Sequence, residues 1–192
     1  MMTLQQLLPE MPLSVLHGSR EIHALRLDSR RVAEGDLFVA LSGGQQDGRR
    51  FIEAAILAGA VAVLTEAEQC SEAEQGGVPV IGMPALPAKL AELAARFHGN
   101  PMVSLTVFGV TGTNGKSSVA WFLRDALNAL GMPCGLIGTL GAHFADYHND
   151  IGHTTPDTLT LHESLAEFRD RGARLLCDSQ LDASLRYGSI DG

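Results

Sequence analysis

The chain has 192 residues, of which 45% are hydrophobic and 19% charged, and its formal net charge is -8. This composition is typical of a globular protein with a sizeable core, and no low-complexity segment is present. Because no cluster of Lys and Arg stands out, neither a nucleic-acid nor a membrane-surface partner is expected. The longest apolar run, residues 54–64, is too short to cross a bilayer, and the start lacks the pattern of a signal peptide. Cys70, Cys134 and Cys177 lack metal-ligand spacing and predict reduced, mostly buried thiols, so a cytoplasmic location is expected.

The first part of the chain, residues 1–98, predicts a small α/β domain. Apolar runs predict strands over 22–27, 36–41, 61–64 and 78–81, and helical spacing predicts helices over 51–59 and 86–97. The acidic stretch from Glu66 to Glu74 is interpreted as a solvated surface loop. A break at Gly99-Asn100-Pro101 then separates this domain from the next.

The second part, residues 103–177, alternates strands with helices. The pattern predicts strands over 103–110, 134–137 and 173–177, and helices over 119–130 and 158–171. Such an order predicts a parallel sheet with right-handed crossover connections. The fold class expected for the whole chain is therefore α/β.

A glycine-rich loop lies between the first strand and the first helix of this second part. It reads Gly112, Thr113, Asn114, Gly115, Lys116, Ser117, Ser118. Backbone N–H groups and the following helix N-terminus can hold the phosphates of ATP, Lys116 can neutralise their charge, and Ser117 can bind Mg²⁺. The usual first glycine of such loops is replaced by Val110, which weakens a kinase or GTPase interpretation. The alternative is a plain tight connection from strand to helix.

Several motifs together resemble the Mur ligase family, most closely its MurE type. They are Thr111–Ser118, Leu27–Arg30, Gly35–Leu41 with Asp47–Ile52, Ile137–Gly141, and Thr154–Leu161. The resemblance implies an N-terminal UDP-substrate-binding domain, followed by the first half of a P-loop ATPase domain. It also implies an ATP-dependent amide ligase, whose small-molecule substrates are UDP-MurNAc-L-Ala-D-Glu, ATP and an amino acid, either meso-diaminopimelate or L-lysine. In such ligases ATP phosphorylates the D-glutamyl carboxylate, and the amine then displaces phosphate.

The resemblance also implies the substrate-binding residues. Leu27, Ser29 and the stretch Gly44, Gln45, Gln46 match positions that contact the uridine end. His153, Thr154 and Thr155 match an Asn-Thr-Thr motif beside the muramoyl peptide, with His153 in place of asparagine. From the residues alone, Asp28-Ser29-Arg30 and Asp47-Gly48 are equally ordinary turn residues, and Asp157 or Thr158 can cap the next helix.

The resemblance ends after Cys177. Ser179 stands where the family has a Mg²⁺-binding glutamate, and Asp178 is one residue out of register, so its side chain should face the other way. Residues 178–192 resemble nothing further, so the resemblance predicts that this chain lacks the rest of the ATPase sheet and the domain for the incoming amino acid. The expectation is an inactive, truncated chain. The rival interpretations are a non-catalytic UDP-sugar or nucleotide-binding module, a MurF-type fragment and an unrelated P-loop enzyme.

Two further features carry no functional prediction. His143, His148 and His153 recur every five residues, a spacing that no single helix or strand places on one face, so a metal site is not expected there. Trp121 lies beside the apolar stripe of the predicted helix and is interpreted as a packing residue.

Overall fold

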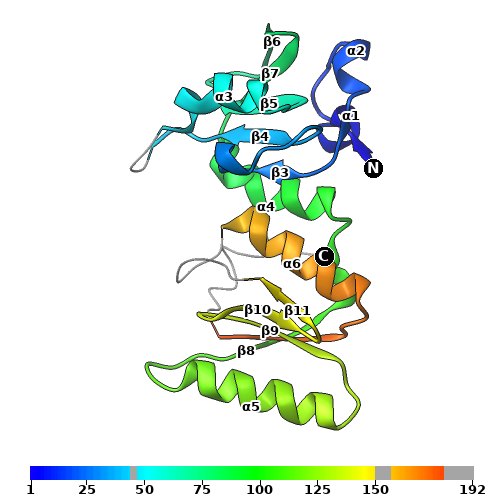
Figure 1. Ribbon diagram of the computed structural model, residues 1–192, viewed down its shortest axis with the longest axis vertical. Helices are drawn as coiled ribbons and strands as arrows, with labels where there is room; N and C mark the ends of the chain where they lie inside the picture. Colours follow the sequence, from blue (N-terminus) through cyan, green and yellow to red (C-terminus); the bar gives the residue numbers. More distant parts are fainter. Residues whose placement is uncertain (44–46, 150–156, 180–192) are drawn as a thin grey trace. The chain divides into compact units, whose positions relative to one another are not determined.

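A computed structural model describes residues 1–43, 47–149 and 157–179 of the chain. The chain divides into two compact units, residues 1–93 and 94–192, which are described separately (Figure 1). The division falls inside helix α4 (Leu86–Phe97), a few residues before the Gly-Asn-Pro break that the sequence marks as the boundary.

The first unit is built on a sheet with the strand order β3-β4-β5-β7-β6. Its strands are β3 (Leu25–Arg26), β4 (Leu37–Ala40), β5 (Ala62–Glu66), β6 (Ser71–Gln75) and β7 (Val78–Met83), and only β6 runs antiparallel to its neighbour. Phe38 and Ala40 pack with Ala55 of helix α3 (Ile52–Leu57), while the alternate residues Leu37 and Val39 are buried on the opposite face. Both faces of the sheet are therefore covered. Because successive residues of a strand point to opposite faces, every residue of such a strand is apolar.

The structure corrects the interpretation of Glu66 to Glu74 as a solvated loop. Glu66 ends β5, and its carboxylate accepts hydrogen bonds from the backbone N–H and the hydroxyl of Ser42 at 2.9 and 2.5 Å. Residues Ser71–Gln75 form the edge strand β6, none of whose residues is buried. The sequence pattern missed this strand because an edge strand without a buried face has no apolar alternation.

Short elements at the start of the chain were also missed. Strands β1 (Met2–Thr3) and β2 (Glu21–Ile22) pair antiparallel, and helices α1 (Leu4–Leu7) and α2 (Val15–Gly18) lie between them in sequence. Each helix is a single turn that begins at a hydroxyl residue, Thr3 or Ser14, whose side chain accepts from a backbone N–H of the first turn.

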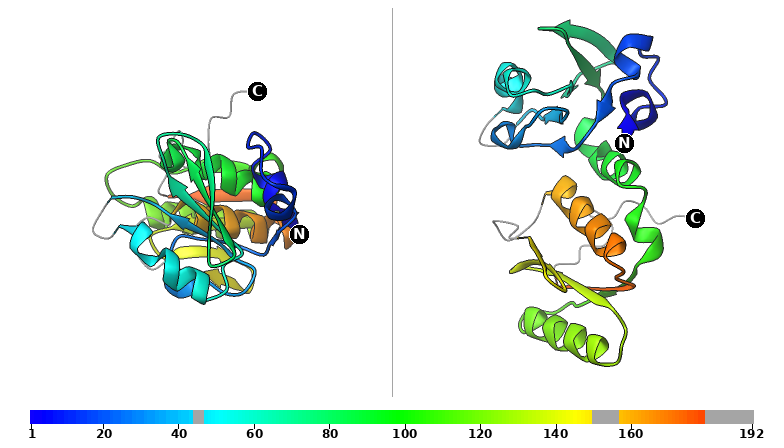
Figure 2. Two further views of the ribbon diagram at one scale, coloured as in Figure 1. Left: turned by 90° about the horizontal axis from the view of Figure 1, so that it is seen from above. Right: turned by 45° about the vertical axis from the view of Figure 1, so that its right-hand side comes forward.

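The second unit has a sheet with the order β11-β10-β9-β12-β8, bounded by helices on both faces (Figures 1 and 2). The strands are β8 (Thr106–Gly109), β9 (Cys134–Gly138), β10 (Gly141–Phe144), β11 (Tyr147–Asn149) and β12 (Leu175–Asp178), and the helices are α5 (Lys116–Ala129) and α6 (Thr158–Asp170). Strands β8, β12 and β9 are parallel, as predicted, whereas the antiparallel hairpin β10–β11 was not foreseen. Residues 103 and 104, expected at the start of the first strand, instead belong to a 3-10 turn (Pro101–Ser104).

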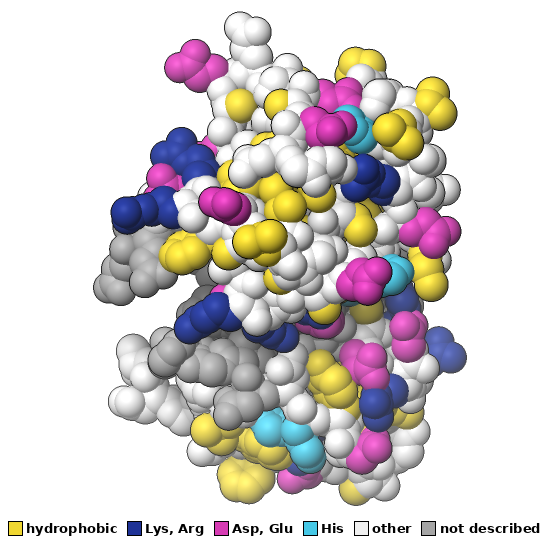
Figure 3. Space-filling model, turned by 45° about the horizontal axis from the view of Figure 1, so that its top comes forward, with side chains coloured by type: hydrophobic (Ala, Val, Ile, Leu, Met, Phe, Trp, Pro, Cys, Tyr) yellow, Lys and Arg dark blue, Asp and Glu magenta, His cyan; other side chains and the backbone are white. Residues whose placement is uncertain are grey.

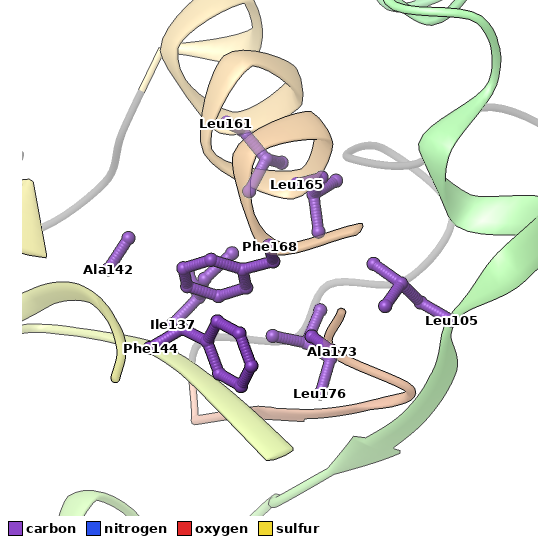
Figure 4. Close-up of a cluster of buried hydrophobic side chains, with 9 residues drawn as sticks. All are labelled: Leu105, Ile137, Ala142, Phe144, Leu161, Leu165, Phe168, Ala173 and Leu176. Atoms are coloured by element: carbon purple, nitrogen blue, oxygen red, sulfur yellow. The ribbon is translucent and has the colours of Figure 1, made fainter. Parts of the chain in front are cut away.

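The two faces of this sheet carry separate cores. Leu161, Leu165 and Phe168 of α6 pack with Ile137, Leu176 and other apolar residues on one face (Figure 4). On the other face Leu136 and Cys177 pack with residues of α5. Neighbouring residues of β9 and β12 thus face opposite helices, which is the expected two-residue period of a strand.

Helix α5 buries a narrower stripe than the sequence predicts. Ala120, Trp121, Leu123 and Leu127 pack on the sheet, which agrees with the packing role expected for Trp121. Val119, Phe122 and Leu130, which belong to the predicted stripe, are instead 53%, 74% and 73% exposed. The helix therefore presents an apolar outer face to solvent.

Charged side chains of the described residues are mixed in sign. On the face drawn in Figure 3, basic side chains lie near acidic ones. Asp28–Arg30 and Asp47–Arg49 are ion pairs within single turns, and Asp146–Arg171 is an ion pair between residues distant in sequence. Among the described helices, none has the length and apolar character needed to cross a membrane.

Candidate functional site

The glycine-rich loop lies at the carboxyl ends of the parallel strands of the second unit. β8 ends at Gly109, the loop follows, and α5 begins at Lys116. Gly112 and Gly115 have φ angles of 144° and 77°, a region that residues with a Cβ adopt only with strain. These two glycines therefore let the chain turn sharply from the strand into the helix, as the sequence predicts.

Val110 stands in the place of the usual first glycine and makes one more hydrogen bond to the neighbouring strand β12 beyond the end of β8. Its N–H donates to the carbonyl of Asp178 at 2.8 Å, and its side chain packs beside the core under α5. The loop proper thus begins at Thr111, and residues Thr111–Gly115 are all exposed. Such an arrangement leaves the backbone of the loop and the first turn of α5 open to an anionic ligand.

Lys116 and Ser117 stand at the helix N-terminus, where both were expected. The Lys116 ammonium group donates to the carbonyl of Gly112 at 2.7 Å, so the side chain folds back over the loop. The hydroxyl of Ser117 is 3.3 Å from that of Thr139, which follows β9. Both groups therefore lie beside the loop, at the N-terminal end of α5.

A hollow of about 450 Å³ opens over this loop. The residues that line it, within the part of the chain that the structure describes, are Thr113, Asn114, Gly115, Lys116, Ser117, Ser118, Thr139 and Ser179. Every lining side chain is polar or absent, and Lys116 supplies a positive charge, so the hollow suits a polar anion. Thr139 and Ser179 were not predicted as site residues. The signal that points to them is topological, because both directly follow strands whose carboxyl ends meet at this edge.

Asp178 and Ser179 differ in where they point. Ser179 lines the hollow, and its N–H donates to the carbonyl of Ile137 at 3.1 Å. Asp178 is the last residue of β12, is fully buried, and is not among the described residues that line the hollow. A Cβ added to Gly138 would lie 2.6 Å from the Ser179 hydroxyl, so glycine at 138 allows this close approach.

Two buried thiols, on the neighbouring strands β9 and β12, belong to the core under α5. The Sγ atoms of Cys134 and Cys177 are 3.5 Å apart. The hydrogen bond to Cys177, together with burial, raises the pKa of the Cys134 thiol well above its ordinary value. Both thiols are free and buried as expected, whereas Cys70 is exposed. Cys134 is therefore an unreactive core residue.

In the first unit, Leu27 and Ser29 lie just past the carboxyl end of β3. Both are partly exposed, and Ser29 opens a 3-10 turn (Ser29–Arg31) capped by Asp28. The Asp28 carboxylate accepts from the Arg30 side chain at 2.7 to 3.1 Å, and this contact lowers the pKa of Asp28 below its usual value. Asp28 thus has a local structural role, and Leu27 and Ser29 remain accessible.

The same motif recurs after β4. Asp47 caps the 3-10 turn Gly48–Phe51, and its contact with the Arg49 side chain lowers the pKa of Asp47. A Cβ on Gly48 would lie 2.9 Å from the carbonyl oxygen of Leu41, so this glycine packs directly on the backbone that leaves β4.

The remaining predicted substrate residues lie outside the described residues. They are Gly44, Gln45 and Gln46 in the first unit and His153, Thr154 and Thr155 in the second. Asp157, the next described residue, caps α6 by accepting from the N–H of Thr160 at 2.9 Å, the structural role considered for it from the sequence.

Comparison with known proteins agrees with this arrangement. Residues 21–98 match the catalytic domain of the Mur ligase family, and residues 110–177 match the Mur ligase middle domain. A UDP-N-acetylmuramoyl-L-alanyl-D-glutamate--2,6-diaminopimelate ligase of Pseudomonas aeruginosa is 44% identical over 189 residues, covering 98% of this chain and 38% of that protein. The Xylella fastidiosa (strain 9a5c) protein of the same name is 42% identical, covering 100% of this chain and 38% of its own length. That alignment includes residues 178–192, for which the sequence alone indicated no resemblance.

Solved structures give the same result. A ligase with this name matches with a TM-score of 0.71 at 27% identity, over 92% of this chain and 35% of that one. MurF from Acinetobacter baumannii matches with a TM-score of 0.60 at 22% identity over 92% of this chain and 35% of its own, a likeness of fold alone.

The chain thus spans about two-fifths of the length of the curated relatives it matches. The two family models match consecutive regions of the chain, one in each α/β unit. On this evidence the chain belongs to the Mur ligase family.

Proposed function

We propose that this chain supplies the UDP-substrate-binding part and the ATP-binding part of a MurE-type ligase. The observation that carries the proposal is the polar hollow over residues 113–118, with Thr139 and Ser179 facing the loop from neighbouring strand ends. Relatives 40–45% identical are named as diaminopimelate ligases, which favours meso-diaminopimelate over L-lysine as the added amino acid.

The proposed reaction has two steps. A carboxylate oxygen of the D-glutamyl residue of UDP-MurNAc-L-Ala-D-Glu attacks the γ-phosphorus of ATP, giving an acyl phosphate and ADP. The amine of the incoming amino acid then attacks the acyl carbon; inorganic phosphate leaves, the nitrogen loses a proton, and an amide bond remains. The phosphoryl group is needed because a carboxylate is a poor electrophile.

The residues of this chain would act mainly by binding and by neutralising charge. The loop N–H groups and the start of α5 would hold the ATP phosphates, and Lys116 would leave its contact with Gly112 to meet the transferring phosphoryl group. A Thermotoga maritima MurF whose solved structure contains ADP matches this chain with a TM-score of 0.51 at 27% identity, which supports a nucleotide as the ligand.

Mg²⁺ fits this hollow only through the hydroxyl of Ser117 and the phosphate oxygens. Ser117, Thr139 and Ser179 offer hydroxyl groups, and among the described residues that line the hollow none is a carboxylate. Mg²⁺ in phosphoryl-transfer sites would screen the phosphate charge, and it is usually held there by one or two carboxylates as well. Mg²⁺ should therefore bind with only modest affinity to the chain when the nucleotide is bound.

Phosphate release from ATP-Mg²⁺ in the presence of UDP-MurNAc-L-Ala-D-Glu tests the proposal, with meso-diaminopimelate and L-lysine added in turn. Release that depends on diaminopimelate supports a MurE-type ligase, and release that depends on D-alanyl-D-alanine with a tripeptide substrate would indicate a MurF type instead. Binding of both the UDP-substrate and ATP without phosphate release fits a part of such a ligase that cannot turn over by itself, whereas binding of the UDP-substrate without ATP would indicate a binding module. ATP binding without any affinity for the UDP-substrate would overturn the proposal in favour of an unrelated P-loop protein.

A further inference from the structure

Two histidines face each other across the β10–β11 hairpin. His143 and His148 are directly opposite in the strand register, and their Nδ1 atoms are 2.9 Å apart. Their spacing of five residues falls on no single face of one element, but the hairpin turn at Ala145-Asp146 brings them together. His148 is exposed and His143 partly exposed, so solvent reaches the pair.

A backbone carbonyl fixes the orientation of His143. Its Nε2 lies 2.7 Å from the carbonyl oxygen of Leu140, which can only accept, so Nε2 carries the proton. The Nδ1 of a neutral His143 therefore has a free lone pair directed toward His148, and His148 donates from its own Nδ1. Histidine ligands of metals commonly have this arrangement, with the second ring nitrogen donating to a carbonyl.

The separation of the two nitrogens matches a chelate. Nitrogens about 2.0–2.1 Å from one metal ion and at right angles to each other are roughly 2.9 Å apart, and in a tetrahedral site roughly 3.3 Å. The measured 2.9 Å thus suits the square or tetragonal geometry that Cu²⁺ and Ni²⁺ prefer. Either ion requires the two rings to turn so that both lone pairs point at the metal instead of along the line between the nitrogens, and a tetrahedral ion would also require the rings to open by about 0.4 Å.

The hairpin holds the pair on a rigid support. Phe144, next to His143, is buried against Phe168 with ring centroids 5.7 Å apart (Figure 4). Tyr147, next to His148, contacts the same Phe168 ring with centroids 5.8 Å apart. The ring of Trp121 lies 5.0 Å from that of His143. The nearby cation Arg124 stacks on Trp121 and pairs with Asp125, which reduces its repulsion of a bound cation.

We propose that His143 and His148 bind one divalent transition-metal ion, of the Cu²⁺ or Ni²⁺ type, through their Nδ1 atoms. Water fills the other positions, since among the described residues no group of three or more His, Cys, Asp or Glu side chains is arranged around a metal. Binding replaces the hydrogen bond between the rings: His148 loses the proton on Nδ1 and takes one from water on Nε2, so a neutral pair releases no net proton.

Trp121 provides the test, because it is the chain's only tryptophan and adjoins the proposed site. The untagged chain is titrated with Cu²⁺ in a non-coordinating buffer, and Trp121 fluorescence is followed together with the electron paramagnetic resonance spectrum. We expect fluorescence to be quenched at one equivalent of Cu²⁺, with a spectrum showing two coordinated nitrogens.

His148→Ala and His148→Asn should each weaken this first binding event roughly tenfold or more, because one of two protein ligands is lost. His148→Asn keeps a hydrogen-bond donor toward His143, so it separates metal binding from a purely structural pairing of the rings. His23→Ala, an exposed histidine of the other unit, should leave the titration unchanged. Unchanged quenching in both His148 variants, with a native circular dichroism spectrum, would overturn the proposal.

Discussion

Lys116 is the residue on which the proposed nucleotide site depends most. It lies at the first position of α5, and its ammonium group donates to the loop carbonyl of Gly112 at 2.7 Å. Replacing it by alanine removes a charge from the hollow without opening a buried cavity. Lys116→Ala should therefore weaken ATP binding roughly tenfold to a hundredfold, the effect of losing one charge-assisted contact, while leaving the melting temperature unchanged.

The chain offers a matched control, since Lys89 is its only other lysine and is exposed on α4. Calorimetric titration with ATP should give the same affinity for Lys89→Ala as for the unmodified chain. Equal affinities for the Lys116 and Lys89 variants would show that the loop does not hold the nucleotide phosphates.

Gly135, in the middle of β9, illustrates how closely α6 packs on the sheet. A Cβ at this position would lie 2.5 Å from Cδ2 of Phe168, a fully buried ring. Gly135→Ala should destabilise the second unit by about 1–3 kcal/mol through overpacking. Urea unfolding followed by Trp121 fluorescence reports on this unit alone, because Trp121 is the only tryptophan.

A second substitution tests the cause. Phe168→Leu makes room for the added methyl group, so the two changes together should cost less than the sum of their separate costs. Strict additivity, or no loss of stability in Gly135→Ala, would mean that the ring of Phe168 does not determine the residue at 135.

At the scale of elements, β6 is held to α2 by a histidine between two glutamates. Nδ1 of His17 contacts Glu72, Nε2 lies 3.2 Å from Glu74, and Glu72 also accepts from the N–H and hydroxyl of Ser14. The hydrogen bond from His17 lowers the pKa of Glu72 below 4.5. A lowered pKa means that this contribution to stability is complete above pH 4.5 and is lost as pH falls through the lowered value.

Glu72→Gln should therefore make β6 and α2 open more easily at pH 7, by about 1 kcal/mol, and the difference from the unmodified chain should shrink below pH 4. Hydrogen exchange of peptides spanning residues 14–18 and 71–75 measures this opening. Glu74→Gln is the control, because Glu74 makes the longer contact and its side chain is 54% exposed. An effect of Glu74→Gln as large as that of Glu72→Gln would contradict the assignment.

The same elements indicate what the sequence could and could not predict. Parallel strands buried on both faces, such as β4, β5 and β9, have continuous apolar runs, and their positions were predicted to within a few residues. β6 was missed because none of its residues is buried, so it has no apolar alternation. The β10–β11 hairpin was missed because its turn begins at Ala145, which has a φ of 52°. Alanine gives no turn signal.

In the candidate site, the residues contiguous in sequence could be predicted, and the residues brought in by the strand order could not. The loop from Gly112 to Ser118 is contiguous, so its place between a strand and a helix could be predicted from spacing alone. Thr139 and Ser179 join it only through the order of the strands, in which β12 is inserted between β9 and β8. No local pattern encodes that insertion.

At the scale of the whole molecule, the two units differ in how much apolar surface they leave open. β8 is the last strand on its side of the described sheet, with Phe108 38% exposed, and Phe122 and Leu130 of α5 are exposed by more than 70%. An open strand edge and an apolar helix face favour association with other chains. Limited proteolysis with mass spectrometry should therefore cleave residues 103–177 before residues 1–98, and light scattering should reveal aggregation at high concentration.

Phe122→Gln with Leu130→Gln should reduce this aggregation without lowering stability, because neither side chain belongs to the core under α5. The helix would keep its buried stripe of Ala120, Leu123 and Leu127 and lose only its outer apolar contacts. The control is Leu57→Gln in the first unit. Leu57 is 82% exposed, and its replacement should leave aggregation unchanged.

For the proteolysis experiment, equal protection of residues 103–177 and 1–98 would contradict the view that the second unit is the less stable one.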